Sequence, residues 1–309
     1  MLTYAHIKSN RRKFLALTGL TPQEFQLVLP AFERAYARRY PATKTQTGDA
    51  RQRKAGGGRK TALDTPEQKL LFALVYLKAY PLQILLGEVF ELSQPRANVW
   101  IHRLLPVLQQ ALKVLGVQPQ RNPREFSRQV RRRGEPLDLI IDGTERRRQR
   151  PKNKAIRDDF YSQHKHTHTD KNLVISPVKT KRISFLSQTY RGRVHDKKMA
   201  DTERIVYPRQ SRVRQDSGFQ GYHPRVAEVL QPKKKPRNGE LRPGEKRHNR
   251  HLARTRVRVE HSLAGVKRAR VLKETLRNYK ANFSDLAMEL GCSLHNLRVR
   301  ERKRRLRKL

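Results

Sequence analysis

Acidic residues and cysteines are scarce in this sequence of 309 residues. There are 27 Asp plus Glu against 70 Lys plus Arg, which gives a formal net charge of +43, and Cys292 is the only cysteine. A single cysteine excludes an intramolecular disulfide and a cysteine-rich zinc site. The positive charge opposes compaction unless a polyanion neutralises it; nucleic acid is the obvious polyanion, and a membrane surface is the rival partner.

Long apolar runs are also missing. The sequence has no run of about 18 apolar residues, the length needed to span a bilayer, and its start, MLTYAHIKSNRRKF, lacks the apolar core of a signal peptide. We therefore expect no membrane partner and a soluble cytoplasmic protein. Hydrophobic residues make up only 36% of the chain, but runs such as LLFALVYL and LDLII can build cores, so the chain is not simply disordered.

The first third of the chain has the start signals of helices. In TPQEF at 21–25 and TPEQK at 65–69, a Thr can cap the helix, a Pro takes the first helical position, and Glu24 or Gln68 can close a capping box. The second helix has leucines at the spacing of a buried face: Leu70, Leu71, Leu74 and Leu77. Between the two helices, residues 44–60 are polar, basic and glycine-rich, which predicts an exposed loop that either follows a phosphate backbone or is a solvated linker.

Residues 81–105 predict a helix-turn-helix. Pro81 starts a short apolar helix, the segment ELS turns the chain, and Ser93 can cap a second helix that we expect Pro106 to kink or end. This second helix would be the recognition helix. Its candidate DNA-binding residues are Gln94, Arg96, Asn98 and Arg103.

After the basic triplet at 131–133 the pattern changes from helices to strands. LDLIID at 137–142 predicts a strand, and TERRRQRP at 144–151 predicts a turn and a second strand. Further strands are expected at 171–178, 182–190 and 212–219, and helices at about 244–272 and 283–298. Strands followed by helices favour an α/β domain with a mixed sheet.

Two aspartates stand at expected strand ends. Asp142 ends LDLIID and precedes Gly143, while Asp216 ends the strand that begins at residue 212. In open α/β sheets, binding sites form outside the carboxyl ends of strands. The alternative is that each Asp begins an ordinary turn, which Asp-Gly often does. For Asp142 alone the two interpretations are balanced, and the second aspartate favours the functional one.

A third carboxylate, Glu260, lies among basic residues on an expected helix. At about 100° per residue, Arg256 is ~40° and Lys267 ~20° from Glu260 around the helix, so the three share a face. The alternative is a solvated helix with a weak Arg–Glu pair. Three carboxylates from two strand ends and one helix form an oxygen site that suits two magnesium ions, as used in in-line phosphoryl transfer.

These segments resemble the DDE transposases of bacterial insertion sequences, in the group with an N-terminal helix-turn-helix and an RNase H-like catalytic domain. The resemblance covers most of residues 60–300, and its specificity comes from the order and spacing of the motifs. The matching text is LVYLKAYPLQILLGEVFELSQPRANVWIHRLLPVL at 74–108, DGTERRRQRP at 142–151, HTDKN at 168–172, VHDKK at 194–198, DSGFQGY at 216–222, PKKKPR at 232–237 and RVRVEHSLAGVKR at 256–268.

The resemblance implies roles for individual residues. Asp142, Asp216 and Glu260 would be the catalytic metal ligands, with Asp142 bridging two Mg²⁺ ions for which Mn²⁺ can substitute. Arg256 and Lys267, which match the family's Arg-x3-Glu-x6-Lys signature, would contact phosphates near the cut.

Several further residues have two interpretations. His195 and Asp196 would support the metal ligands or simply cap a helix, and Glu145 is the residue most easily mistaken for a ligand. Basic side chains at Lys233, Lys234 and Lys235 would bind phosphate or form a solvated charge run. His164, His166 and His168, at strand spacing, could hold a metal, but histidines beside DNA need none.

The expected architecture is a helical DNA-binding domain at 1–133, with the helix-turn-helix at about 81–105, an RNase H-like α/β domain at 134–300 and a basic tail at 301–309. The resemblance implies cleavage and strand transfer on double-stranded DNA at inverted-repeat ends, by a homodimer or higher oligomer associated with the bacterial nucleoid. The rival interpretations are a regulatory or decayed DNA-binding protein, an RNase H-like nuclease without strand transfer, and a basic RNA-binding or structural protein.

Overall fold

The computed structural model describes residues 1–43, 49–50, 52, 62–132, 136–236 and 238–307. By its internal contacts the chain forms two compact units. We call them the helical unit (Met1–Gln118, Arg268–Val271 and Leu286–Leu309) and the sheet unit (Pro119–Lys267 and Leu272–Asp285). The domain bounds expected from the sequence stay predictions. Most of the polar loop expected at 44–60 lies outside the described residues.

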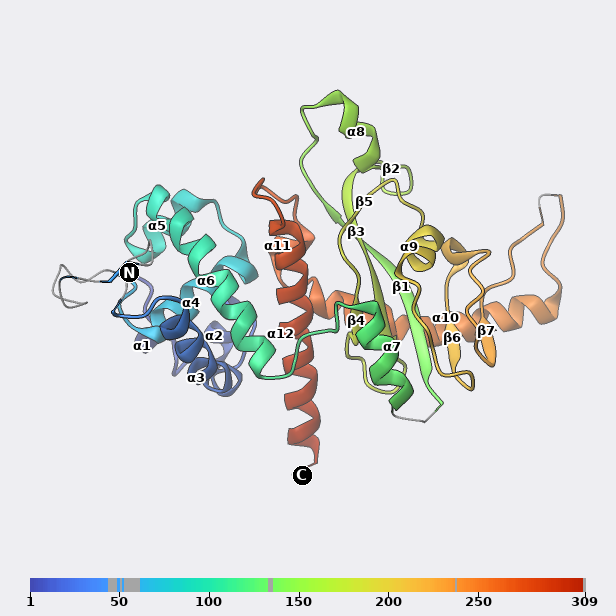
Figure 1. The fold of residues 1–309 in the computed structure, drawn as a ribbon, viewed down its shortest axis with the longest axis horizontal. Coiled ribbons are helices and arrows are strands. Elements are labelled where there is room, and N and C mark those ends of the chain that lie inside the picture. The colour runs from blue at the N-terminus through green and yellow to red at the C-terminus, as the bar shows by residue number, and fades with distance from the viewer. Residues whose placement is uncertain (44–48, 51, 53–61, 133–135, 237, 308–309) are drawn as a thin grey trace. The chain divides into compact units, whose positions relative to one another are not determined.

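Among the first six helices of the helical unit (Figure 1), α1 to α4 each begin after a Thr or Asn whose side chain caps the helix, whereas α5 and α6 have no side-chain cap. Thr21 and Glu24 form the predicted capping box, in which each side chain accepts a hydrogen bond from the other's backbone N–H. Thr65 also caps its helix, but Gln68 bonds to backbone atoms of Leu2 and Tyr4 instead of closing a box. The bounds are α1 Tyr4–Ile7, α2 Arg11–Thr18, α3 Pro22–Arg39, α4 Pro66–Ala79, α5 Gln83–Phe90 and α6 Gln94–Val114.

Helix α4 is the centre of the helical unit's core. The four leucines that predicted its buried face are almost fully buried, and so are the residues between them from Gln68 to Leu77. A helix that is apolar on all sides is typical of a core position. The burial of this helix predicts that much of the unit's stability depends on it.

Helices α5 and α6 form the predicted helix-turn-helix, joined by a short turn. Gly87 lies where α6 approaches, because a Cβ there would be 2.4 Å from the backbone oxygen of Leu92. Pro106 was expected to kink or end the second helix; it does not end it, because α6 continues to Val114 with Pro106 inside it.

Within the described residues, the sheet unit is built on a mixed seven-stranded sheet. Strand β3 is antiparallel to β1, β4 and β5, whereas β6 is parallel to β1 and β7 is parallel to β6. This confirms the expected α/β class with a mixed sheet. The strands are β1 Asp138–Arg147, β2 Tyr161–Ser162, β3 Thr167–Pro177, β4 Phe185–Leu186, β5 Tyr190–Arg191, β6 Arg212–Arg214 and β7 Glu228–Leu230.

Strand β1 contradicts the expected turn after Asp142. It runs without interruption through Gly143 to Arg147, and Asp142 pairs with Val174 of β3 in the middle of the strand. Asp-Gly is a common turn signal, but a glycine inside a strand also marks a place where another group comes close to the backbone. Here the close group is the carboxylate of Asp196.

Helices cover the sheet. Odd-numbered residues of β1, such as Leu139 and Ile141, pack with Met199 of α9 and Phe219 in one hydrophobic core. The helical elements are α7 Pro123–Arg132, α8 Lys154–Phe160, α9 Asp196–Glu203, the 3₁₀ turn η1 Ser217–Phe219, α10 Pro243–Val266, α11 Arg270–Lys273 and α12 Phe283–Leu306.

Helix α12 begins in the sheet unit and continues in the helical unit from Leu286. The basic tail expected from residue 301 onward is helical as far as Leu306. Among the described residues, none of the helices is both long and apolar enough to cross a bilayer.

Candidate active site

Parallel pairing of β1 with β6 brings two aspartates to the same place. Ile140 pairs with Arg214, and Asp142 and Asp216 each follow two residues later in the same direction. The two carboxylates therefore meet although they are far apart in the sequence. Asp216 is held by local structure, because its Oδ1 accepts a 2.7 Å hydrogen bond from the backbone N–H of Gly218 at the start of η1.

The Asp142 carboxyl is in an unfavourable electrostatic environment. Burial, which is the largest cause, and the neighbouring charges of Asp216 and Asp196 together raise its pKa to about 7, while Arg256 acts in the opposite direction. Burial and like charges both disfavour the ionised form of a carboxyl. At neutral pH this side chain is therefore poised between its protonated and ionised forms.

Asp196 lies near the two aspartates, against Gly143 and Gly218, because these glycines leave room for its carboxylate. A Cβ at Gly143 would be 2.7 Å from Asp196 Oδ1, and a Cβ at Gly218 would be 2.9 Å from its Oδ2. Both distances are too short for a real Cβ atom. Each glycine follows one of the aspartates closely, so the segments DG at 142–143 and DSG at 216–218 supply both a carboxylate and a space for a third carboxylate.

Lys171 of β3 links Asp196 to Glu145. Its Nζ lies 3.3 Å from Asp196 Oδ1 and 3.4 Å from Glu145 Oε1. Glu145 also accepts a 2.8 Å hydrogen bond from the Thr169 hydroxyl. Glu145 is thus engaged by two side chains of β3. His195 occupies the N-cap position of α9, but its side chain makes no capping hydrogen bond.

Helix α10 presents one basic face to Asp142 and Asp216. Arg256 forms a 3.5 Å ion pair with Asp216, and its Nε is buried with no hydrogen-bond partner among the described residues. At the end of the helix, burial lowers the pKa of Lys267; nearby cations add to this, while Asp142 and Glu145 oppose it.

Glu260 does not meet the aspartates directly. It is exposed, and it makes no hydrogen bond or ion pair within the part of the chain that the structure describes. It nevertheless shares a face with Arg256 and Lys267, which both act on the charge of Asp142. The structure thus brings Asp142, Asp216 and Asp196 together and leaves Glu260 one helical turn beyond Arg256.

The donor set fits a divalent cation in part. Carboxylate oxygens are the ligands that Mg²⁺ prefers, and Asp142 and Asp216 repel each other in the absence of a cation. Among the described residues, however, no three Asp, Glu, His or Cys side chains converge closely enough to hold a metal. This also applies to the expected histidine cluster, because His164 and His166 lie in the turn before β3 rather than in a strand.

The four candidate DNA-binding residues of α6 differ in accessibility. Gln94 and Arg96 are exposed, whereas Asn98 is half-buried. Gln94 and Asn98 donate hydrogen bonds of 2.7 and 3.1 Å to Oε1 of Gln83 on α5. Gln83 therefore fixes the side-chain amides of both residues. Arg103 is half-buried and lies over the rings of Trp100 and Tyr40, which makes it less available to DNA.

The lysine run 233–235 is exposed and lies against α10. The backbone N–H of Lys233 donates a 2.9 Å hydrogen bond to Asn249 Oδ1, and Asn249 Nδ2 donates one of 2.9 Å to the backbone oxygen of Lys233. The three lysine side chains make no ion pair within the described part of the chain. They are therefore free to bind phosphate, although a solvated charge run has the same geometry.

Sequence reasoning missed Lys171 and the two glycines. Lys171 is half-buried in the middle of a strand, a position that a lysine seldom takes without a charged partner. That placement was the available signal, but its partners Glu145 and Asp196 belong to other elements. The need for Gly143 and Gly218 depends on Asp196, which is also distant in the sequence.

Comparisons with known proteins agree with this arrangement. Residues 141–296, about half of the chain, match the family described as DDE superfamily endonuclease, and residues 61–113 match the helix-turn-helix of DDE superfamily endonuclease. The chain is 30% identical over 158 residues to a Microchaete diplosiphon protein described as "Probable transposase for insertion sequence element IS702". The match covers 51% of this chain and 56% of that protein, so the chain spans little more than half of this relative's length. No solved structure matches the chain.

Proposed function

Because the chain belongs to the DDE superfamily of endonucleases and carries that superfamily's helix-turn-helix, we propose that it is the transposase of a bacterial insertion sequence. It would bind the inverted-repeat ends of its element, cut the DNA there to release a 3′-hydroxyl, and join that hydroxyl to target DNA. The observation that carries the proposal is the meeting of Asp142 and Asp216 beside Arg256. Two like-charged carboxyls that lie together, with the pKa of one raised to about 7, are an arrangement typical of functional sites.

We assign the cation to Asp142 and Asp216, with Glu260, which shares a face of α10 with Arg256, as the third ligand. Two Mg²⁺ ions, for which Mn²⁺ can substitute, would supply activation of the attacking hydroxyl and stabilisation of the leaving oxygen. Lys171, through its ion pair with Asp196, would offset part of the negative charge beside the two aspartates. The alternative third ligand is Asp196, which already lies beside both aspartates.

Both buried and exposed side chains would hold the DNA. The Nε of Arg256 is a buried donor without a partner among the described residues, and it can donate a hydrogen bond to a phosphate oxygen near the cut. Lys267 and the lysine run 233–235 would bind phosphates farther along. In the helical unit, Gln94, Arg96 and Asn98 would read the element's ends, with Arg103 in a supporting position. Pairing of two ends would require a homodimer or a higher oligomer.

The test is metal-dependent cleavage and strand transfer on DNA that carries the element's ends. Glu260→Gln should lower cleavage by at least about 100-fold, because one charged oxygen ligand is lost, while end binding is unchanged. Glu33→Gln, an exposed glutamate of α3, is the matched control and should cut normally. Full activity of Glu260→Gln together with loss in Asp196→Asn would transfer the third-ligand role to Asp196.

A second candidate function is a DNA-binding regulator that has lost catalysis. The observation that favours it is the exposed position of Glu260, with no three acidic side chains converging among the described residues. End binding without cutting by the unaltered protein, in Mg²⁺ and in Mn²⁺, would establish it and refute the transposase.

A further inference from the structure

The sheet unit contains a cavity away from the three proposed metal ligands. Its volume is about 310 Å³, and it opens between the end of β1, Phe160 of α8, β5 and the loop 276–282 that leads into α12. Small-molecule sites have volumes of roughly 300–1,000 Å³, so the cavity has room for one small planar group. We call it the Phe160 pocket.

Aromatic rings and guanidinium groups line the Phe160 pocket. The guanidinium carbons of Arg148 and Arg191 lie 3.8 and 5.5 Å from the centre of the Phe160 ring. Tyr190 and Tyr279 also line the pocket, and 75% of Tyr279 is exposed to solvent. Flat rings and guanidinium planes at one opening are the surfaces on which the bases of single-stranded nucleic acid stack.

The charges of the Phe160 pocket are suited to an anion. Its acids are already paired: Asp170 with Arg148 at 2.9 Å and Asp285 with Arg121 at 2.6 Å. Lys280 lines the pocket and makes no ion pair among the described residues. A phosphate at the opening would therefore meet a cation that has no competing partner.

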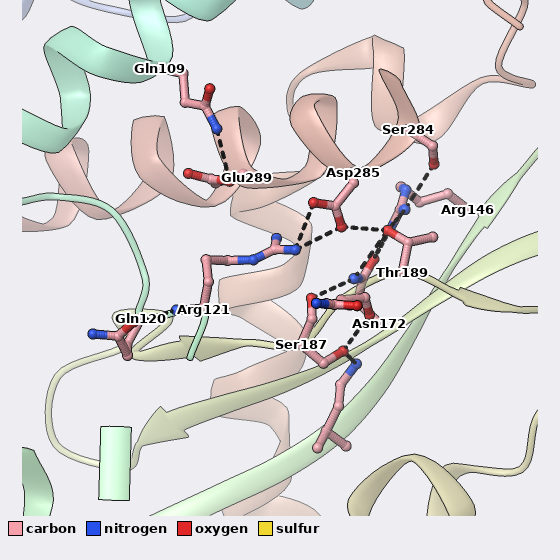
Figure 2. Close-up of polar contacts among 12 residues, drawn as sticks. Gln109, Gln120, Arg121, Arg146, Asn172, Ser187, Thr189, Ser284, Asp285 and Glu289 are labelled. Atoms are coloured by element: carbon pink, nitrogen blue, oxygen red, sulfur yellow. Dashed lines mark hydrogen bonds and ion pairs between the residues drawn. The ribbon is translucent and has the colours of Figure 1, made fainter. Parts of the chain in front are cut away.

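The floor of the Phe160 pocket is rigid. Figure 2 shows Thr189 bonded to Asp285 and Arg146 bonded to Ser284, at 2.7 and 3.0 Å. Ser284 in turn donates a 2.6 Å hydrogen bond to Asp170. Such a connected polar floor keeps its shape without a ligand, which lowers the entropy that binding must overcome.

Two buried polar atoms of the lining residues have no partner. The donor Arg148 Nε and the acceptor Gln149 Oε1 are both buried and unbonded among the described residues. Buried polar groups of this kind are rare, because leaving each one unsatisfied is unfavourable. A nucleobase presents donors and acceptors along one edge and can satisfy both atoms.

The Phe160 pocket lies on the same face of β1 as Asp142. Alternate residues of a strand point to one face, so Asp142, Arg146 and Arg148 belong together. Six residues of extended chain cover about 20 Å. Stacked DNA rises about 3.4 Å per nucleotide on one strand, so this separation equals roughly six nucleotides.

We propose that the Phe160 pocket binds one unstacked nucleotide of a DNA strand whose scissile phosphate lies at Asp142. The base stacks on Tyr279 and the Phe160–arginine wall, its edge bonds to Arg148 Nε and Gln149 Oε1, and the phosphate pairs with Lys280. This inference rests on the proposed action on DNA. The pocket would hold a strand that has left the duplex near the cut.

The test uses a single-stranded 12-nucleotide DNA with one 2-aminopurine, whose fluorescence falls on stacking, at a fixed salt concentration. The full chain should quench the probe. Tyr279→Ala should bind about 10-fold more weakly and lose the quenching, because stacking on one aromatic ring is lost. Tyr279→Phe should restore both, and Lys280→Gln should weaken binding without removing the quenching.

Tyr161→Ala is the matched control, since that tyrosine is 39% exposed and does not line the pocket. Equal affinity and quenching in the unaltered protein and Tyr279→Ala would overturn the proposal, as would absence of quenching by the unaltered protein. Equally tight binding of dAMP alone would assign the pocket to free nucleotides instead. Cleavage of duplex ends is measured separately. Normal cleavage by the Tyr279→Ala variant would refute only the proposed role of the Phe160 pocket. Absence of cleavage by the unaltered protein would refute only the proposed transposase activity.

Discussion

Replacing Asp142 by Asn should stabilise the protein in the absence of divalent cations. The pKa of this carboxyl is raised from its ordinary value of 3.8 to about 7 by burial and by the charges of Asp216 and Asp196. At about 1.36 kcal/mol per pKa unit, the shift corresponds to about 4 kcal/mol. Asp142 keeps partial contact with solvent, which screens the repulsion, so we expect about 2 kcal/mol.

The sign of the effect depends on pH. Between pH 4 and pH 7 the folded protein holds a proton on Asp142 that the unfolded chain has released, so stability falls as the pH rises through this window. Asn cannot titrate and has nearly the same shape. The advantage of Asp142→Asn should therefore be absent near pH 4, grow up to about pH 7 and stay constant above it.

The assay is urea denaturation followed by circular dichroism, at pH 4.5, 6, 7 and 8 in the presence of a chelator. Asp158→Asn is the control, because its side chain is 75% exposed and should show no such dependence. Added Mg²⁺ should stabilise the unaltered protein at pH 8 and should leave Asp142→Asn nearly unchanged. The claim that burial and like charges disfavour ionised Asp142 would be refuted in either of two cases. Asp142→Asn would be less stable than the unaltered protein at pH 8, or the difference in stability would not depend on pH.

Two further predictions follow from the close contacts. Gly143→Ala places a Cβ 2.7 Å from Asp196 Oδ1, so it should displace Asp196. We expect metal-dependent cleavage to fall at least about 10-fold while DNA binding is unchanged. The control Gly244→Ala, whose Cβ meets nothing within 4 Å, should cut normally. Gln83→Ala releases the two amides of α6 that it fixes, so binding to the element's ends in a mobility-shift assay should weaken by about 3- to 10-fold, while binding to unrelated DNA stays the same. Equal loss on both DNAs would show that Gln83 acts on folding instead.

Local signals predicted the helices well because their causes are local. The capping box at Thr21 and Glu24 needs only four residues, and both of its hydrogen bonds form. The buried leucines of α4 follow from spacing along one helix. The shared face of Arg256 and Glu260 likewise follows from the helical repeat alone. In each case the signal lies within one short segment of the chain.

The geometry of the candidate site was harder to predict because its causes are distant. Asp142 was expected at the end of the strand LDLIID, yet β1 stays paired with β3 through Gly143 to Arg147, and Asp196 takes the space beside Gly143. The same holds for Lys171, whose role appears only once β1, β3 and α9 are assembled. A sequence names the residue types of such a site, but the register of β1 with β3 and β6 decides which of them meet.

In the candidate site, the ionised forms of Asp142 and of Lys267 are both disfavoured. On the sheet, burial and like charges raise the pKa of Asp142, whereas on α10 burial and neighbouring cations lower the pKa of Lys267. Nearby, Arg256 has a buried donor without an acceptor. A cation alone would relieve the acids, and a phosphate alone would relieve the basic residues. A phosphodiester bound together with a cation would relieve both sets, which agrees with the proposed cutting of DNA.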